Sequence, residues 1–451
     1  MIKKSLFGIL VVLILFVFAT GCDSVQKKSS SSDDFKRGPS GLVMNFIPNY
    51  PGDKYTVTDT NEDISVVVDV RNKGTYPPES APGNGKFSSG KLYLSGFDDR
   101  IIDMSGLTEE DINKMKSDKK VDISDLEEEA IYDVRDSTGF FSGIGLDSTW
   151  ITDDNIADRE TTPLVIDLTD ATITDEQREK FITAYQKARV LQRKAKPLSE
   201  MFLPAASPIN PTGSLDSAEF DGEIVSDNIL VDSYDPKVLI TACYPYVTKA
   251  SPTVCIDPNP FDDLEEKVCN IGSQNLETQG APIAVTEIEQ EASTNKIQFK
   301  IHIKNVGDGD VLKTGVSAVK DKDAAGNEIE VNVLDRCSPL SGGKLDRKDF
   351  DRVQVTKINV GDVDLWNVDN AATPDVNENK CSPFADGTDD IIRLFDGEGF
   401  VICTLNLNNG AAEGVFTNVE SAYTTPITIG LSYSYRSTIS KQIEIKKLET
   451  R

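Results

Sequence analysis

Seven cysteines and one histidine are the residues of this 451-residue chain whose types could support distinctive chemistry. His302 lies in the alternating segment KIQFKIHIKN, which is typical of a β-strand, and we expect its side chain to occupy one face of that strand. A Ser-His-Asp triad would depend on this single imidazole, and the sequence contains no Gly-x-Ser-x-Gly nucleophile elbow. Catalysis through a histidine-activated nucleophile is therefore disfavoured.

The cysteines divide into Cys22 near the N-terminus and six further downstream. An even number of cysteines in an exported chain favours disulfides, and a zinc site is disfavoured because the chain has no CxxC spacing and one histidine. Six cysteines allow many pairings. The expected pairs are Cys243 with Cys255, which flank a segment of hairpin length, Cys337 with Cys381, which both precede Ser-Pro, and Cys269 with Cys403.

Acidic loops are the remaining candidates for ligand chemistry. Calcium takes several carboxylate and carbonyl oxygens from loops, and three loops could supply them. Their candidate ligands are Asp308, Asp310, Asp362, Asp364, Asp386 and Asp389. None of the loops fits the EF-hand pattern, and solvated acidic turns are the alternative interpretation. A carboxylate pair for glycoside hydrolysis cannot be picked out among 74 acidic residues. Apart from this candidate structural calcium, we expect no cofactor.

The charge balance narrows the choice of partners. The chain has 47 Lys plus Arg against 74 Asp plus Glu, which gives a formal net charge of −27. Such a polyanion does not bind nucleic acid or acidic lipid through general electrostatics, and its charge keeps an extracellular protein soluble. Hydrophobic residues make up 38% of the chain, enough to build buried cores.

The first 22 residues have the pattern of an export signal. Lys3 and Lys4 precede an apolar run from Leu6 to Ala19, which is short for a membrane span, and Ala19-Thr20-Gly21-Cys22 follows. Small residues before a cysteine resemble the lipobox of prokaryotic lipoproteins, which implies cleavage, lipidation of Cys22 and anchoring to the outer face of the membrane. An ordinary signal peptide or an uncleaved anchor helix is the alternative. Residues 23–40 are rich in serine and predict a flexible tether.

The rest of the chain shows a weak internal repeat. Two alternating strands, Ile64–Val70 and Ile297–Ile303, each lead into an Asn-x-Gly turn. Two further segments align without gaps and share a Tyr-x-Tyr motif, Leu239–Ile256 and Thr428–Ile445, and each predicts a hairpin. We therefore expect a mainly β protein of two β-sandwich domains, residues 41–258 and 278–449, joined by a linker over residues 259–277.

Helical insertions distinguish the first predicted domain. Capping signatures predict helices over Thr108–Ser117 and Ser124–Val134, and a longer helix begins at Thr174 and ends before Pro197. Phe181, Ala184, Tyr185, Ala188 and Leu191 form an apolar stripe on the long helix, and its C-terminal end is basic. Such a helix packs on its own sheet or docks a surface partner, and the residues alone leave both alternatives open.

The strands leading into Asn-x-Gly turns, repeated in an exported chain, resemble CARDB-like and other immunoglobulin-like modules of archaeal and bacterial surface proteins. The resemblance covers about a third of the chain and transfers no functional residue. It implies immunoglobulin-like β-sandwich domains that serve adhesion or act as spacers. We therefore expect a non-enzymatic surface lipoprotein that contacts the membrane through its N-terminus and proteins at the cell surface, and not nucleic acid. A solute-binding lipoprotein with a pocket between the helices and the sheet, or a carboxylate-dependent surface hydrolase, is the alternative.

Overall fold

The computed structural model describes residues 37–78, 85–127, 130–131, 163–171, 173–261, 267–293, 296–322, 328–340, 345–366, 381–383, 390–407 and 421–448. The predicted signal peptide, Cys22 and most of the predicted tether lie outside these residues. Mainly antiparallel β-sheet makes up the described part, as the sequence predicts. Residues 35–451 group by their contacts into one compact unit. We call residues 37–261 the first half and residues 267–448 the second half.

Each half contributes one large sheet of its own. The first-half sheet has the strand order β1 (Leu42–Phe46), β3 (Glu62–Asn72), β9 (Ser214–Ile224) and β5 (Ile102–Asp103). The second-half sheet has the order β13 (Gln274–Asn275), β14 (Ile283–Ser293), β15 (Lys296–Asn305), β23 (Glu398–Asn406) and β21 (Cys381–Ser382). In β3 and β15 every second side chain is buried, so both predicted Asn-x-Gly strands are confirmed.

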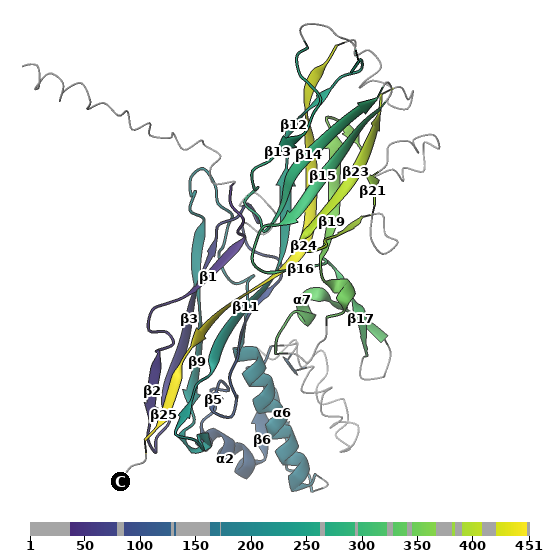
Figure 1. Ribbon diagram of the computed structural model, residues 1–451. Helices are drawn as coiled ribbons and strands as arrows, with labels where there is room; N and C mark the ends of the chain where they lie inside the picture. Colours follow the sequence, from purple (N-terminus) through teal and green to yellow (C-terminus); the bar gives the residue numbers. More distant parts are fainter. Residues whose placement is uncertain are drawn as a thin grey trace, which may run out of the picture. The chain divides into compact units, whose positions relative to one another are not determined.

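A third sheet belongs to both halves. Its main path is β20 (Val363–Asp364), β19 (Arg352–Val360), β24 (Tyr423–Gln442), β11 (Lys237–Ala250), β4 (Lys91–Ser95) and β8 (Ala195–Pro197). Three short strands pair off this path: β12 (Thr253–Ile256), β16 (Asp310–Leu312) and β22 (Ile391–Arg393). Strands β11 and β24 pair antiparallel along all 14 residues of β11, and Figure 1 shows them running side by side.

The two predicted Tyr-x-Tyr hairpins are wrong. Strand β12 pairs with the beginning of β24 and not with β11, and β24 continues unbroken through the predicted turn. The cause is the length of both strands: each extends out of its own half and lies at the edge of the other half's part of the shared sheet. The halves thus exchange an edge strand, and one continuous hydrophobic core cluster contains residues of both.

The repeat in the sequence corresponds to an approximate two-fold axis between β11 and β24. Tyr244 lies opposite Tyr435, and Tyr246 lies opposite Tyr433. Their rings pack together, with centroid separations of 5.9 Å and 6.0 Å for these two pairs. Three of the four tyrosines are fully buried, and burial raises their pKa above the ordinary value of 10.

The Asn-x-Gly turns close on these tyrosines. Gly74 and Gly307 occupy equivalent places, and a Cβ atom on either would collide with the hydroxyl of Tyr246 or Tyr435, respectively. The side chains of Asn72 and Asn305 each accept a hydrogen bond from the glycine N–H two residues on. Glycine is therefore required in both turns because a buried tyrosine occupies the space a side chain would need.

Smaller elements complete the described part. They are β2 (Lys54–Val57), β6 (Lys120–Asp122), β7 (Val165–Asp167), β10 (Ser233–Tyr234), β17 (Val316–Lys322), β18 (Glu328–Asn332), β25 (Glu444–Lys447) and the helices α2 (Glu109–Asp118), α6 (Asp175–Arg193) and α7 (Val333–Arg336), with single 3₁₀ turns at Ser226–Asn228 and Arg347–Asp349. The predicted linker contributes β13, and the last residues of the predicted tether are packed: Arg37 forms an ion pair with Glu277, and Gly38 N–H donates to Thr278 Oγ1.

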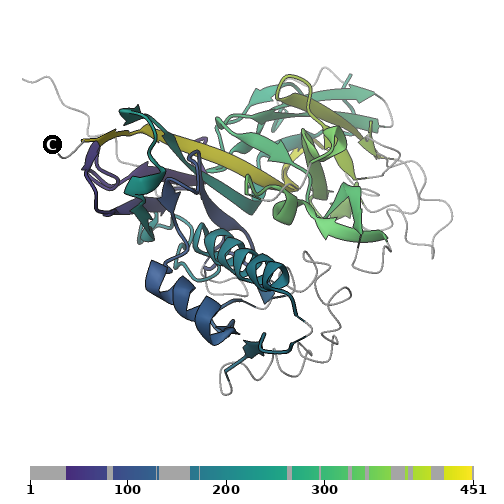
Figure 2. The ribbon, with the colours of Figure 1, turned by 90° about the horizontal axis from the view of Figure 1, so that it is seen from below.

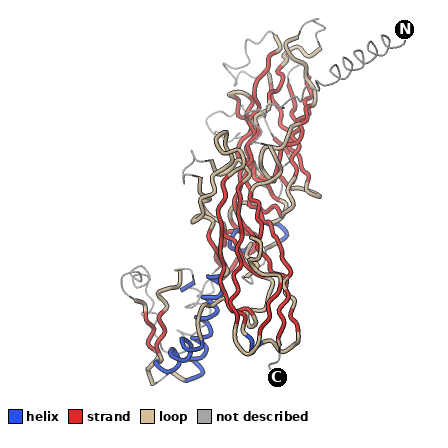
Figure 3. Tube along the Cα trace, turned by 90° about the vertical axis from the view of Figure 1, so that its left-hand side faces the viewer, coloured by secondary structure: helices blue, strands red, loops and turns tan. Residues whose placement is uncertain are grey.

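Two of the predicted helices are present. Thr108 caps α2 and Thr174 caps α6, each through the capping box that the sequence indicates. Residues 124–126 form a turn and not the start of a helix, residues 130–131 are helical, and the other residues of the predicted Ser124–Val134 helix after Glu127 lie outside the described part. Figures 2 and 3 show α2 and α6 side by side, next to the strands of the first half.

Candidate functional site: the helical insertion and the cavity beside it

The helical insertion, which we define as α2, β6, β7 and α6, has a hydrophobic core of its own. Phe181, Ile182, Tyr185 and Ala188 of α6 are buried, close to the apolar face that the sequence predicts. They pack against buried residues of β6, β7 and the following segments: Val121, Ile123, Leu126, Ile131, Leu164, Ile166, Leu168 and Ile173. This cluster is separate from the main core, although Val190 of α6 packs against that core, so apolar and polar contacts together hold the insertion against the sheets.

Basic residues at the C-terminal end of α6 make those contacts. Arg193 donates to the carbonyl oxygens of Met104 and Asp221, at 2.9 Å and 3.2 Å. Lys194 is buried and forms a 2.5 Å ion pair with Asp99. Carbonyl oxygens and a carboxylate near a helix C-terminus are favourable partners for cations. The buried face of α6 thus packs within its own half, with Arg193 and Lys194 fixing its C-terminal end, and docking of a surface partner remains a prediction.

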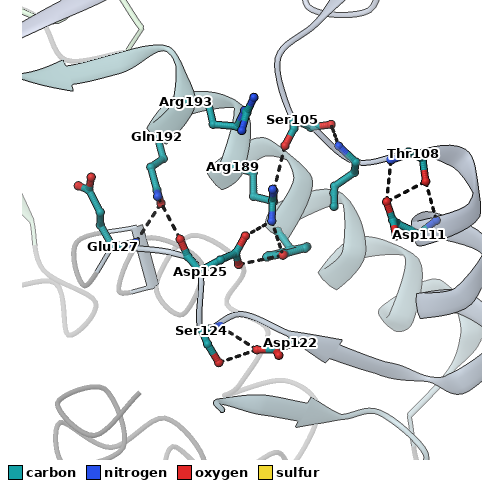
Figure 4. Close-up of polar contacts among 12 residues, drawn as sticks. Ser105, Thr108, Asp111, Asp122, Ser124, Asp125, Glu127, Arg189, Gln192 and Arg193 are labelled. Carbon is teal, nitrogen blue, oxygen red and sulfur yellow. Dashed lines mark hydrogen bonds and ion pairs between the residues drawn. The ribbon is translucent and has the colours of Figure 1, made fainter. Parts of the chain in front are cut away.

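A polar network joins α6 to the turn at residues 124–127 (Figure 4). Tyr185 donates its hydroxyl to Asp125 Oδ1 at 3.0 Å, and Arg189 donates to the Tyr185 oxygen at 3.0 Å while forming an ion pair with Asp125. Gln192 donates to the Asp125 carbonyl and accepts from Glu127 N–H. Burial raises the pKa of Tyr185 to about 12, so its hydroxyl stays protonated and acts as a donor at neutral pH.

A cavity of about 140 Å³ lies beside the insertion. Its walls come from β4, the C-terminal part of α6 and the segment after α7, and its polar lining includes Lys91, Gln192, Asp335 and Ser338. Pockets that hold drug-sized ligands measure about 300–1,000 Å³. The cavity therefore has the location expected for a solute-binding lipoprotein, but only the volume for water or a very small solute.

The six downstream cysteines form three disulfides, and none has the expected partner. The observed pairs are Cys243–Cys337, Cys255–Cys269 and Cys381–Cys403. The prediction failed for a geometric reason. Cys243 lies in β11 and Cys255 in β12, and these strands pair with successive parts of β24 instead of with each other. The two cysteines therefore lie far apart along β24 and do not face one another, as a disulfide requires.

Each disulfide has a local role. Cys243–Cys337 ties the segment after α7 to β11, Cys255–Cys269 ties the predicted linker to β12, and Cys381 lies directly opposite Cys403 in the β21–β23 pair. Disulfides are typical of oxidising compartments outside the cytoplasm. They indicate where this protein folds, and they do not form a redox site with the histidine.

The aspartates proposed as calcium ligands do not gather in the described part. Asp310 accepts two hydrogen bonds from Arg436, at 2.9 Å and 2.7 Å, and Asp364 accepts one from Trp366 N–H. Asp308 and Asp362 lie in separate turns, and Asp386 and Asp389 fall outside the described residues. Calcium binding therefore remains a prediction.

Among the described residues, the one group of three or more potential metal ligands is Glu287, Glu289 and His302. His302 lies in a strand, as expected, on the outer face of β15, and its Nε2 is 2.6 Å from Glu289 Oε1. The Lys300 ammonium is 3.1 Å from the same oxygen, and these contacts lower the pKa of Glu289. A metal ion would compete with a cation already in place, so we interpret the group as cross-strand charge pairing.

Sequence reasoning missed this group, although a local signal was present. Glu287 and Glu289 alternate along one strand, Lys300 and His302 alternate along the next, and only two residues separate the strands. Opposite charges at alternate positions of neighbouring strands predict cross-strand pairs on the solvent face.

No protein-family model matches the chain, and no curated protein is significantly similar to it. Among the described residues, none of the helices combines the length and the apolar composition that crossing a bilayer requires. Any functional assignment must therefore come from the sequence features and the geometry above.

Proposed function

We propose that this protein is a non-enzymatic surface lipoprotein that is held to the outer face of the membrane by lipid on Cys22 and serves adhesion or envelope structure. The observation that carries the proposal is the combination of a lipobox-like leader with six downstream cysteines that are all paired. Exported domains form disulfides in the oxidising compartments outside the cytoplasm. The immunoglobulin-like character of the sandwiches is part of this proposal.

The exchange of edge strands supports a mechanical role. A spacer or adhesion module transmits force along its chain, and two domains on a flexible linker bend at that linker. Here the 14-residue pairing of β11 with β24 replaces such a joint. The small volume of the cavity beside α6 favours this role over solute capture.

Fractionation of cells expressing the full chain tests the proposal. We expect the protein in the membrane fraction, accessible to added protease, with a mass that begins at a lipid-modified Cys22 and lacks six thiol hydrogens. Cys22→Ala should remove the lipid and reduce membrane association, and Ser24→Ala is the matched control. An unlipidated chain in the cytosol with free thiols would contradict the proposal.

A further inference from the structure

A hollow of about 400 Å³ lies between the free edge of β1 and the C-terminal part of β24. Residues 39–44 form one wall, Ser437 to Ile439 form the opposite wall, and the rings of Tyr244 and Tyr435 also line it. Strand β1 is the last strand of its sheet, so one side of its backbone has no neighbouring strand among the described residues. This hollow is separate from the cavity beside α6.

The two-fold relation shows what fills the equivalent place in the second half. Leu42 N–H donates to the Tyr244 hydroxyl, and Ile283 N–H donates in the same way to that of Tyr433. Likewise, the carbonyls of Gly41 and Pro282 each accept from an Asn-x-Gly turn. Strands β1 and β14 therefore correspond residue by residue at this point.

One difference concerns the next backbone groups along each strand. The carboxamide of Gln279 accepts from Val285 N–H at 2.8 Å and donates to the Val285 carbonyl at 3.0 Å. Counted along each chain segment from the equivalent residues Leu42 and Ile283, Met44 corresponds to Val285, and Gly38 corresponds to Gln279. Glycine has no side chain, so the carboxamide that serves the second half has no counterpart in the first half.

The direction of the Met44 backbone follows from the pairing of β1 with β3. Gly41 carbonyl accepts from Lys73 N–H, and Ile47 N–H donates to the Val67 carbonyl. Gly41 and Ile47 therefore direct their backbone groups towards β3. In an antiparallel pair the direction alternates from one residue to the next. Met44 lies three residues from each of them, so its N–H and C=O groups point away from β3. Met44 lines the hollow and therefore offers it one donor and one acceptor.

A second difference concerns a hydroxyl. Thr248 Oγ1 donates to the Ile283 carbonyl at 2.7 Å in the second half. Its counterpart, Ser437, lines the hollow, and its buried Oγ has no hydrogen-bond partner. Burial raises the pKa of Tyr244, and Leu42 N–H and the nearby Ser437 hydroxyl both oppose that rise. An unpaired buried hydroxyl costs free energy unless a ligand satisfies it.

The lining is otherwise close to neutral. Asp308 is its one charged residue, and burial raises the pKa of Tyr435 to about 12, with Asp308 and Asp310 adding to the rise. Both tyrosines stay uncharged at neutral pH, and the proline and tyrosine walls are largely apolar. An anionic ligand would be repelled by Asp308, whereas a neutral polar group with an apolar body fits.

We propose that the hollow binds the primary carboxamide of a glutamine or asparagine side chain that belongs to a separate molecule. The amide C=O accepts from Met44 N–H, its N–H donates to the Met44 carbonyl, and Ser437 supplies a further hydroxyl. The contact repeats outside the chain what Gln279 does for Val285 within it.

The probe is N-acetylglutamine methylamide, added to the full chain and followed by NMR at the amides of Leu42 and Met44. Its isosteric acid, N-acetylglutamate methylamide, is the matched control because a carboxylate cannot donate to the Met44 carbonyl. We expect the amide to slow hydrogen exchange at Met44 and to bind about tenfold more tightly than the acid, the value of one hydrogen bond.

Substitutions locate the site. Ser437→Leu fills the hollow and should weaken binding by about tenfold or more, while Ser440→Leu, at an exposed position of the same strand, should leave it unchanged. Ser437→Ala removes only the hydroxyl and serves if the leucine variant does not fold.

Slow exchange at Met44 without probe, accelerated by Ser437→Leu, would show that the chain's own residues fill the hollow and would overturn the binding of a separate molecule. Equal binding of amide and acid, or fast Met44 exchange at saturating probe, would overturn the proposal. Neither result depends on whether Cys22 is lipidated.

Discussion

Single residues in this protein have well-defined electrostatic surroundings. Asp98 accepts two hydrogen bonds from the Arg100 guanidinium and one from Arg100 N–H, and these contacts lower its pKa to about 2. Both side chains lie at the surface, so solvent screens the pair and its effect on stability is small. The pair is nevertheless a precise test of local geometry, because a bidentate contact with one partner sets the shift.

We expect the Asp98 carboxyl to titrate at about 2 by NMR, and Arg100→Ala to return its pKa towards the ordinary value of about 3.9. Since the folded pKa lies below the unfolded one, the contribution to stability is present above about pH 4 and is lost as the pH falls through about 2. Asp98→Asn should remove this acid-dependent part. An unchanged Asp98 pKa in Arg100→Ala would exclude the contact.

At the scale of elements, features set by neighbouring residues could be predicted from the sequence, whereas contacts between distant segments could not. Helix α6 was predicted with its cap, because Thr174 and Gln177 form the capping box within four residues. The disulfides were not, because Cys243 meets Cys337 only after β11, β24 and α7 are in place. The polar network of Arg189 also escaped prediction, since Ser105 and Asp125 come from separate loops.

Arg189→Ala should loosen α6 from the turn at residues 124–127. The side chain is 18% exposed, it donates to Ser105 carbonyl and Tyr185, and it pairs with Asp125, so its loss should lower the free energy of unfolding by about 1–3 kcal/mol. Lys187→Ala, at an exposed position of the same helix, is the control and should change it by less than about 0.5 kcal/mol. Urea unfolding measures both. Equal effects would mean that the network does not hold the helix.

For the molecule as a whole, the mainly β fold and the repeat were predictable, whereas the exchange of strands was not. Alternation along β3 and β15 depends on each strand alone. The partner of β11 could have been β12, the nearest candidate in sequence, and only the observed register with β24 excludes this. Tyr244 and Tyr435 were placed in corresponding motifs by the sequence, but nothing in it showed that the motifs face one another.

The shared sheet predicts that both halves unfold together. Ile64→Ala in β3 and Ile301→Ala in β15 each remove a buried side chain and should cost about 2–5 kcal/mol. In calorimetry each variant should shift one common transition to lower temperature, while Asn45→Ala, at an exposed position of β1, should not shift it. Two separate peaks, each sensitive to one variant only, would contradict this coupling.

The exchanged strands also fix an order of events during biosynthesis. Strand β11 leaves the ribosome long before β24, the last long strand, and at ~5–20 residues per second the delay is roughly ten seconds or more. Until β24 arrives, β11 has an unpaired edge and the buried side of Tyr244 and Tyr246 is uncovered. A first half made without β24 would therefore expose this strand edge and these rings, and only completion of the C-terminal strand covers them.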